Sequence, residues 1–245
     1  MITSEMNVIR KCLRDDEMSQ QGYVDKRCSS CYAGARRKQL FEFKVLYLKC
    51  FFRKMSQCAA NAKRALVFLA PGAEEMEFVV AADVLRRGGT LPLPACRIRR
   101  SSSAAGGVNI QPDISVSDAK GPYDVLVLPG GLGGSKAMAE SKAVGELLKQ
   151  QEKAGKMIAA ICAAPTALKA HGVALGKNVT SYPAMKPQME EGGNYSYKED
   201  NVVVDGNVIT SRGPGTAFDF ALTIVDKLAG KEKASEVAKA MLLSY

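Results

Sequence analysis

The sequence lacks long apolar runs and contains little cysteine over most of its length. A membrane-spanning helix needs about 20 consecutive apolar residues, and no run in the 245-residue chain approaches that length, so we expect no membrane span. Five of the seven cysteines precede residue 60, and their total is odd. This distribution argues against a secreted, disulfide-linked fold and favours a reducing compartment. We therefore expect a cytoplasmic protein, with the nucleus and the mitochondrion as additional locations.

Residues 1–62 show no clean periodic pattern and carry an excess of positive charge. They hold 12 Lys and Arg against 6 Asp and Glu, and so account for 6 of the 9 net positive charges. We expect a basic, disordered extension, followed by one α/β domain over residues 63–245. Because most of the excess charge lies in the extension, nucleic-acid binding is not expected as a main role of the domain.

Cys28 and Cys31 have the spacing of a zinc-binding pair. A single CxxC pair is a weak metal signal when neither a second pair nor a nearby histidine accompanies it. The sequence therefore predicts no metal site.

From residue 63 onward, short apolar runs alternate with amphipathic stretches of helical period. Strands are expected at residues 64–70, 90–97, 108–111, 124–128, 157–161 and 178–181, with a hairpin over 197–210 that turns at Asp205-Gly206. Helices are expected at residues 73–87, 141–153, 165–170, 216–228 and 231–243. Pro92 and Pro94 shift the second strand towards an edge or an irregular segment. This alternation is typical of an α/β fold with a mostly parallel sheet and helices on both faces.

The helical period also predicts which side chains face the sheet. On the helix at 73–87, Met76, Val80 and Val84 recur at four-residue spacing and are expected to face inward. On the helix at 216–228, the inward positions are expected to be Phe218, Leu222, Val225 and Leu228.

Residues 156–167 contain the segment around which we expect a functional site. Residues 157–161 form an apolar run without alternation, which is typical of a parallel strand covered on both faces. Pro165 suits the first turn of a helix. Cys162 lies between them, near free backbone N–H groups and the positive end of a helix dipole, both of which favour the thiolate. A cysteine can equally be a small apolar filler, and this segment alone leaves the two interpretations even.

A glycine-rich loop, Pro-Gly-Gly-Leu-Gly-Gly at residues 129–134, follows another buried strand. It is not a P-loop, because no Gly-Lys-Ser/Thr follows, and it lacks the GxGxxG spacing of a dinucleotide site. Its glycines are better explained by a close approach of backbone N–H groups to a partner at the end of the strand. Parallel sheets bind ligands at this edge, where residues 71–77 and Cys162 are also expected.

Four motifs together resemble the ThiJ/PfpI superfamily. They are PGAEEME at 71–77, VLPGG at 127–131, AAICAAPTAL at 159–168 and TSRGPGTAFDFAL at 210–222. The resemblance covers about residues 63–245 and leaves the extension outside. It implies a flavodoxin-like three-layer sandwich, a homodimer and no cofactor.

The resemblance also implies the residues of a site. Cys162 would be the reactive group, with Glu77 hydrogen-bonded to its thiol, and the N–H groups of Gly131 and Ala163 would stabilise an oxyanion. The pocket would be lined by Gly130, Tyr182, Arg212 and Pro214. Taken alone, Glu77 resembles a helix-start acid that complements the dipole, but within the motif we favour a role in the site.

The chain departs from the family pattern where many relatives carry a histidine near the site. The matching segment reads Thr-Ser-Tyr-Pro at residues 180–183, so this position holds Tyr182. His171, the single histidine of the chain, falls on or after the helix that follows Cys162 and does not match. A Cys–His–acid triad is therefore not expected, and proton transfer would use Glu77, water or Tyr182.

Two functions are consistent with these residues. One is a cysteine-dependent deglycase or glyoxalase that acts on methylglyoxal, glyoxal or their adducts on proteins and nucleotides, in protection against oxidative stress. The Cys162 thiolate would add to a carbonyl, Glu77 would move the proton, and water would release lactate or glycolate. The alternative is a redox-sensing chaperone whose Cys162 is oxidised to a sulfinate. Both need a reactive thiolate, so we expect Cys162 to be the most acidic thiol of residues 63–245.

Overall fold

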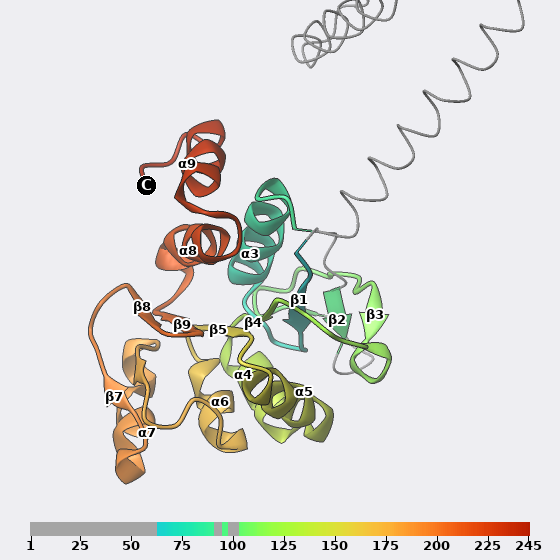
Figure 1. Ribbon diagram of the computed structural model, residues 1–245. Coiled ribbons are helices and arrows are strands. Elements are labelled where there is room, and N and C mark those ends of the chain that lie inside the picture. The colour runs from blue at the N-terminus through green and yellow to red at the C-terminus, as the bar shows by residue number, and fades with distance from the viewer. Residues whose placement is uncertain (1–62, 91–94, 98–102) are drawn as a thin grey trace, which may run out of the picture. The chain divides into compact units, whose positions relative to one another are not determined.

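The computed structural model describes residues 63–90, 95–97 and 103–245, so the predicted extension and its Cys28–Cys31 pair lie outside the described residues. A seven-stranded sheet forms the centre of the domain, in the order β3-β2-β1-β4-β5-β9-β8 (Figure 1). Its strands are β1 (Ala65–Leu69), β2 (Ala95–Arg97), β3 (Ile114–Ser115), β4 (Val125–Leu128), β5 (Met157–Ile161), β8 (Val202–Asp205) and β9 (Val208–Ser211). All neighbouring strands pair in parallel except β8 and β9, which confirms the predicted α/β class.

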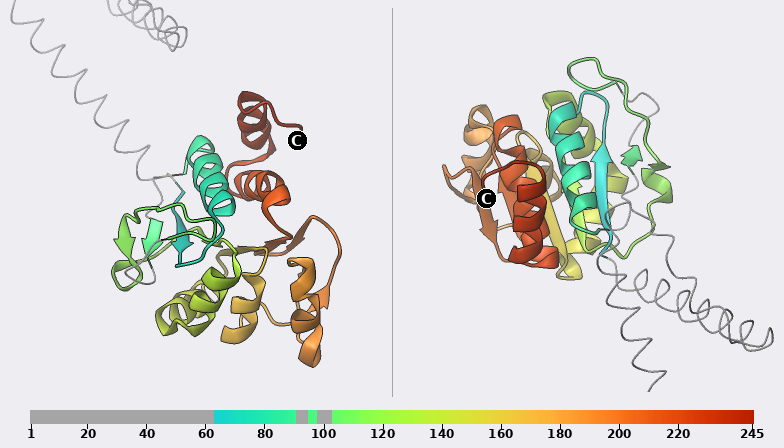
Figure 2. Two further views of the ribbon diagram at one scale, coloured as in Figure 1. Left: turned by 180° about the vertical axis from the view of Figure 1, so that it is seen from behind. Right: turned by 90° about the horizontal axis from the view of Figure 1, so that it is seen from above.

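Helices cover both faces of this sheet, as Figure 2 shows from two further sides. One layer consists of α3 (Glu75–Arg87), α8 (Ala217–Ala229) and α9 (Lys231–Ala240), and the other of α4 (Leu132–Glu140), α5 (Lys142–Lys153) and α6 (Pro165–His171). Strand β1 is buried along its whole length: Val67 packs in the cluster of the first layer and Phe68 in that of the second. A strand covered on both faces needs apolar side chains throughout, which explains the unbroken apolar runs of the sequence.

The chain between α6 and β8 forms a small unit beside the main sheet. Strands β6 (Asn178–Val179) and β7 (Ser196–Tyr197) pair in parallel, and α7 (Lys186–Glu190) lies between them in the sequence. Short 3-10 turns complete the domain: η1 (Val116–Asp118), η2 (Pro183–Met185), η3 (Glu191–Gly193) and η4 (Pro214–Thr216). No helix among the described residues is both long enough and apolar enough to cross a membrane.

The predicted inner faces of two helices are partly wrong. Met76 is 54% exposed and Phe218 is 36% exposed, although Val84, Leu222 and Val225 are buried as expected. The buried stripe of α3 consists of Glu77, Phe78, Ala81, Val84 and Leu85. A glutamate at the start of this stripe interrupts its apolar pattern, which is why the sequence suggested the neighbouring face.

The strand predictions need three corrections. Residues 108–111 form no strand; Asn109 makes only an isolated bridge to Ser103, and the strand lies later, at β3. Strand β2 lies between β1 and β3 rather than at an edge. The hairpin of β8 and β9 pairs Asp205 with Val208, so its turn residues are one position later than predicted.

Candidate active site

Cys162 lies at the carboxyl end of β5, where the chain turns sharply into α6. Its φ is 64°, in the left-handed region that a non-glycine residue adopts at a cost of about 1–3 kcal/mol. The surrounding chain compensates through both backbone groups: the Cys162 N–H donates to the Ser211 carbonyl (3.0 Å), and its carbonyl accepts from the Tyr182 N–H (2.7 Å). This strained strand-to-helix turn is the geometry that presents a nucleophile in other α/β enzymes. The Cys162 side chain is 8% exposed.

Three glutamates in the first turn of α3 have three different environments. Glu74 is the N-cap, and its side chain accepts from the Glu77 N–H (2.7 Å). Glu75 accepts from the Gly106 N–H (3.0 Å). Glu77 points into the protein, is fully buried, and accepts through Oε2 from the Gly130 N–H (2.7 Å). Glu77 is therefore not an exposed acid that merely complements the helix dipole.

Burial raises the pKa of the Glu77 carboxyl from 4.5 to about 7, although the Gly130 N–H and the Cys162 side chain oppose this shift. The second oxygen, Oε1, accepts no hydrogen bond from an N–H or O–H group of the described residues. A buried carboxylate oxygen without a donor is poorly stabilised, so the neutral acid is favoured. Glu77 can thus both hold and release a proton near neutral pH.

The thiol of Cys162 differs from the sequence-based expectation. Burial, followed by the neighbouring Glu77 charge, raises its pKa to about 12, while the Gly131 and Ala163 N–H groups that bond to the sulfur act in the opposite direction. This direction is opposite to the one expected from the sequence, because loss of solvation outweighs the backbone donors; the expected ranking of Cys162 against Cys96 stays a prediction. Cys162 and Glu77 interact and titrate as a pair in which the carboxyl gives up its proton first. The Glu77 carboxylate is thus the group placed to take the thiol proton.

The glycine-rich loop touches both members of this pair. A Cβ atom at Gly130 would lie 2.6 Å from Cys162 Cβ and 2.8 Å from Glu77 Oε2. A Cβ atom at Gly131, where φ is 80°, would lie 2.6 Å from the Glu74 backbone nitrogen. These distances confirm that the glycines allow a close approach of the backbone at the end of β4.

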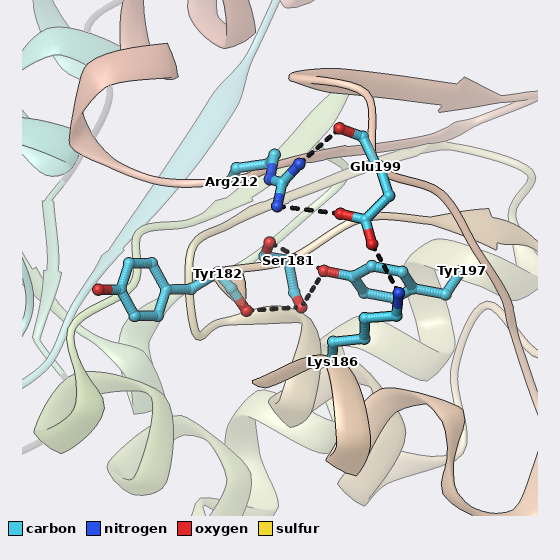
Figure 3. Close-up of polar contacts among 6 residues, drawn as sticks. All are labelled: Ser181, Tyr182, Lys186, Tyr197, Glu199 and Arg212. Carbon is cyan, nitrogen blue, oxygen red and sulfur yellow. Dashed lines mark hydrogen bonds and ion pairs between the residues drawn. The ribbon is translucent and has the colours of Figure 1, made fainter. Parts of the chain in front are cut away.

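The other predicted pocket residues, Tyr182, Arg212 and Pro214, belong to the two segments that bond to the elbow backbone and to the turn that follows. Tyr182 contacts Cys162 through its backbone, and its half-exposed ring lies next to Gly213. Arg212 directly follows Ser211, which pairs with Ile161, but its guanidinium is directed to Glu199 (Figure 3). Pro214 opens η4, the turn that follows. The structure thus brings Cys162, Glu77, Gly130, Gly131 and Ala163 together. Tyr182 bonds to the elbow backbone, whereas a pocket-lining role for Arg212 and Pro214 stays a prediction.

His171 lies away from this group, in agreement with its poor match to the family pattern. Its Nε2 is 2.9 Å from the Met138 carbonyl of α4, and its ring packs against Gly145 of α5. Among the described residues no cluster of His, Cys, Asp and Glu could hold a metal ion.

Sequence reasoning missed Lys186 and Glu199, which form ion contacts next to Arg212 and Tyr182. Both lie in charged surface segments and carry no motif. A single sequence does not show which of two distant charged residues will form an ion pair.

Known proteins share this arrangement of elements and motifs. The sequence model of the DJ-1/PfpI family matches residues 63–227. Protein dj-1beta of Drosophila melanogaster is 58% identical over 187 residues, which are 75% of this chain and 99% of that protein. The crystal structure of the same fly protein has a TM-score of 0.71 to this chain at 57% identity, and covers 75% of this chain and all of that one.

Two further relatives extend the comparison. The Parkinson disease protein 7 homolog of Danio rerio is 52% identical over 184 residues, covering 74% of this chain and 97% of that protein. The glutathione-independent glyoxalase DJR-1.2 of Caenorhabditis elegans is 47% identical over 187 residues, covering 76% of this chain and 99% of that protein. Because such relatives match over nearly their whole length, and the family model covers both the glycine-rich loop and the cysteine elbow, this chain belongs to the DJ-1/PfpI family and has its flavodoxin-like fold.

Proposed function

We propose that this chain is a cysteine-dependent deglycase or glyoxalase that needs no cofactor and acts on methylglyoxal, glyoxal or their early adducts on proteins and nucleotides. The main support is the pairing of Cys162 with a buried Glu77 whose pKa is about 7. A general base is most effective when its pKa lies near the working pH. A relative named as a glutathione-independent glyoxalase also supports the proposal.

The reaction proceeds in steps that balance without an external oxidant. The Glu77 carboxylate takes the thiol proton while Sγ of Cys162 attacks the aldehyde carbon of methylglyoxal, so that a C–S bond forms and the C=O double bond becomes an alkoxide. Glu77 passes its proton to this alkoxide, which gives a hemithioacetal and restores the carboxylate. The carboxylate then removes the proton from the same carbon and returns it to the adjacent carbon, while the hydroxyl proton moves to the former ketone oxygen, which leaves a lactoyl thioester. Water hydrolyses the thioester, releases lactate and restores the thiol. The aldehyde carbon is oxidised and the ketone carbon is reduced, so no redox cofactor is required.

The backbone donors are placed to stabilise charge during these steps. The Gly131 and Ala163 N–H groups both bond to the sulfur. When the sulfur attacks a carbonyl, the oxygen of the adduct develops negative charge next to the same donors. Preorganised N–H groups at such a position commonly account for about 10²–10³ in rate. We assign both groups this oxyanion role.

The alternative is a redox-sensing chaperone in which Cys162 is oxidised to a sulfinate. The Gly131 and Ala163 N–H groups and a protonated Glu77 could bind the sulfinate oxygens, which supports this function. Peroxide attacks the thiolate rather than the thiol, so the raised pKa of Cys162 bears on this function as it does on the enzyme, and both need Glu77 to take the thiol proton.

Lactate production from methylglyoxal by the full chain and by Cys162→Ser distinguishes these functions, together with the intact mass after limited peroxide. The enzyme predicts lactate formation that Cys162→Ser abolishes. A sensor predicts no lactate above background and a gain of two oxygen atoms on Cys162 alone.

We also propose that the chain forms a homodimer. Met76 and Val79 of α3 are exposed apolar side chains, and Val79 lines a cavity of about 410 Å³ together with Phe78, Arg86 and Gln111. Covering such a surface with a second copy would remove apolar area from water. Sedimentation of the full chain beside Val79→Glu tests this: the wild type should sediment as a dimer, and the variant as a monomer.

The predicted division into an extension and a domain over residues 63–245 also stays a proposal. It is supported by the two hydrophobic clusters that residues 65–238 form on the faces of the sheet. A fragment that starts at Met55 should unfold cooperatively in urea at the same midpoint as the folded part of the full chain. A fragment without a cooperative transition would place the boundary elsewhere.

A further inference from the structure

Both backbone groups of Cys162 are held by segments that come from other parts of the chain. Its N–H donates to the Ser211 carbonyl, at the end of β9, and its carbonyl accepts from the N–H of Tyr182, just before η2. Each segment continues to a cation: Arg212 follows Ser211 directly, and Lys186 follows Tyr182 by one short turn. The conformation of the elbow therefore depends on how these two segments are placed.

A single carboxylate connects the two cations (Figure 3). Oε1 of Glu199 is 2.6 Å from Lys186 Nζ, and Oε2 is 3.1 Å from Arg212 Nη2. Arg212 also donates through Nη1 to the Glu199 carbonyl (2.5 Å), so its guanidinium is held by two contacts. Only 22% of the Arg212 side chain is exposed, although that of Glu199 is 58% exposed.

Tyr197 adds a second connection between the same segments. The Lys186 ammonium lies 5.3 Å from the centre of the Tyr197 ring, within the range of a cation–π interaction. The Tyr197 hydroxyl donates to the Ser181 carbonyl (3.2 Å), which belongs to the residue before Tyr182. The segment from 197 to 199 thus contacts Ser181 and Lys186, which flank the Tyr182 N–H that bonds to the elbow.

We propose that Glu199 is a positioning residue of the Cys162 site, because it links Lys186 to Arg212 and so fixes the two segments that hold the strained elbow. The contacts form a closed ring: from Cys162 through Tyr182 and Lys186 to Glu199, and back through Arg212 and Ser211. The Lys186 hydrogen bond, followed by the charges of Lys186 and Arg212, keeps the pKa of Glu199 below its usual value, so the bridge is charged at neutral pH.

The link from Lys186 through Glu199 to Arg212 should affect the conformation of the elbow more than the free energy of unfolding of the whole domain. Exposed ion pairs contribute little to global unfolding, but the left-handed φ of Cys162 persists only while its surroundings enforce it. If the two segments move apart, the elbow can relax and the sulfur leaves the Gly131 N–H and the Glu77 carboxyl. The catalytic consequence rests on the proposed function, whereas the ordering of the elbow does not.

Hydrogen exchange of the full chain, followed by mass spectrometry, measures this ordering directly. Glu199→Gln keeps the shape and removes the charge, and we expect the Cys162 and Tyr182 amides to exchange about two- to fivefold faster. Lys186→Gln should have a similar effect, and the double variant should add little to either single change because both remove one link. About 1 M salt, where the Debye length is about 3 Å, should speed exchange in the wild type but not in Glu199→Gln.

Glu236→Gln is the matched control, because it removes an exposed ion pair to Lys233 (2.9 Å) on α9. The proposal is wrong if Glu199→Gln leaves exchange at the elbow at the wild-type or the control rate, or if salt affects wild type and variant alike. Lactate assays on the same samples separate the two proposals. If Glu199→Gln exchanges faster but neither the wild type nor any variant forms lactate, the positioning role is supported and the proposed enzymatic activity is contradicted. Unchanged exchange with normal lactate contradicts the positioning role alone.

Discussion

The N–H group of Gly130 donates to Oε2 of Glu77 over 2.7 Å and brings the loop after β4 against the buried acid of α3. The same glycine lies against Cys162, since a Cβ atom at this position would approach Cys162 Cβ to 2.6 Å. One residue without a side chain therefore lets three segments from different parts of the sequence meet. The proximity of acid and thiol depends on it.

Gly130→Ala should disrupt the site more than the fold. The added methyl group collides with Cys162 Cβ, Glu77 Oε2 and the Ile161 carbonyl, and overpacking of this kind costs about 1–3 kcal/mol. A displacement of about 1 Å at reacting atoms can cost about 100-fold in rate, so we expect lactate production to fall by about that factor. Gly215→Ala is the control, because a Cβ atom there meets nothing within 4 Å. Equal activity of the two variants would show that the close approach is not needed.

The pH dependence of activity should follow the Glu77 carboxyl. Its pKa is about 7 in the folded protein, and only the carboxylate can take the thiol proton. We expect kcat/KM for methylglyoxal to rise as the pH increases through about 7 and to level off above it. Glu77→Gln should abolish this step and reduce the rate by about 10²–10⁴. Alkylation of Cys162 by iodoacetamide should show the same step in the wild type.

Glu75→Gln is the appropriate control for that series. Glu75 lies in the same turn of α3 but bonds to the exposed backbone of Gly106. It should keep the pH step and most of the activity. If Glu77→Gln and Glu75→Gln have the same profile, another group supplies the proton transfer and the proposed base is wrong.

Local sequence patterns predicted much of this site. The elbow was placed correctly from the apolar run of β5, from Pro165 and from the small residues around Cys162. Each of these features determines the conformation of the backbone at its own position, so no distant contact is needed to interpret it. The glycine-rich loop was interpreted correctly for the same reason. The pKa of the thiol was not predictable in this way, because burial of Cys162 depends on how distant segments pack around it.

Other features were missed because they are set by long-range contacts. The inner face of α3 includes Glu77, whose polar side chain breaks the pattern that identifies buried helix faces. The link between Lys186, Glu199 and Arg212 joins three segments of the chain, and their spacing in the sequence does not predict that they touch. Strand β3 has only two residues, too few for a strand pattern.

The free energy of unfolding should depend on pH through Glu77. Its folded-state pKa is raised from 4.5 to about 7, so the folded state retains a proton that the unfolded state has lost between these values. The contribution of this group is fully present below about pH 4.5 and is lost as the pH rises through about 7. Its upper magnitude is about 3 kcal/mol. Glu77→Gln cannot ionise, so near pH 8 it should be more stable than the wild type by up to that amount.

Urea unfolding at pH 5 and pH 8 tests the effect, with Glu75→Gln again as control. The difference between wild type and Glu77→Gln should be small at pH 5 and large at pH 8. A difference that does not change with pH would mean that Glu77 ionises normally in the folded protein. The enzyme would then lack a base tuned to neutral pH.

The last prediction concerns Tyr182, which the family resemblance places where a histidine would be expected. Its contribution should come from the backbone, because its N–H holds the Cys162 carbonyl at 2.7 Å, while its ring is 45% exposed and its hydroxyl points away from Ser181 and Arg212 (Figure 3). Tyr182→Phe keeps the N–H and the ring but removes the only proton of the side chain that can be exchanged. We therefore expect kcat to stay within about threefold of the wild-type value, well short of the 10²–10⁴ of a general acid or base, and the pH step near 7 to remain. A loss of 100-fold or more in Tyr182→Phe, with normal alkylation of Cys162, would identify the phenol as the proton donor and would reduce Glu77 to a group that orients the thiol.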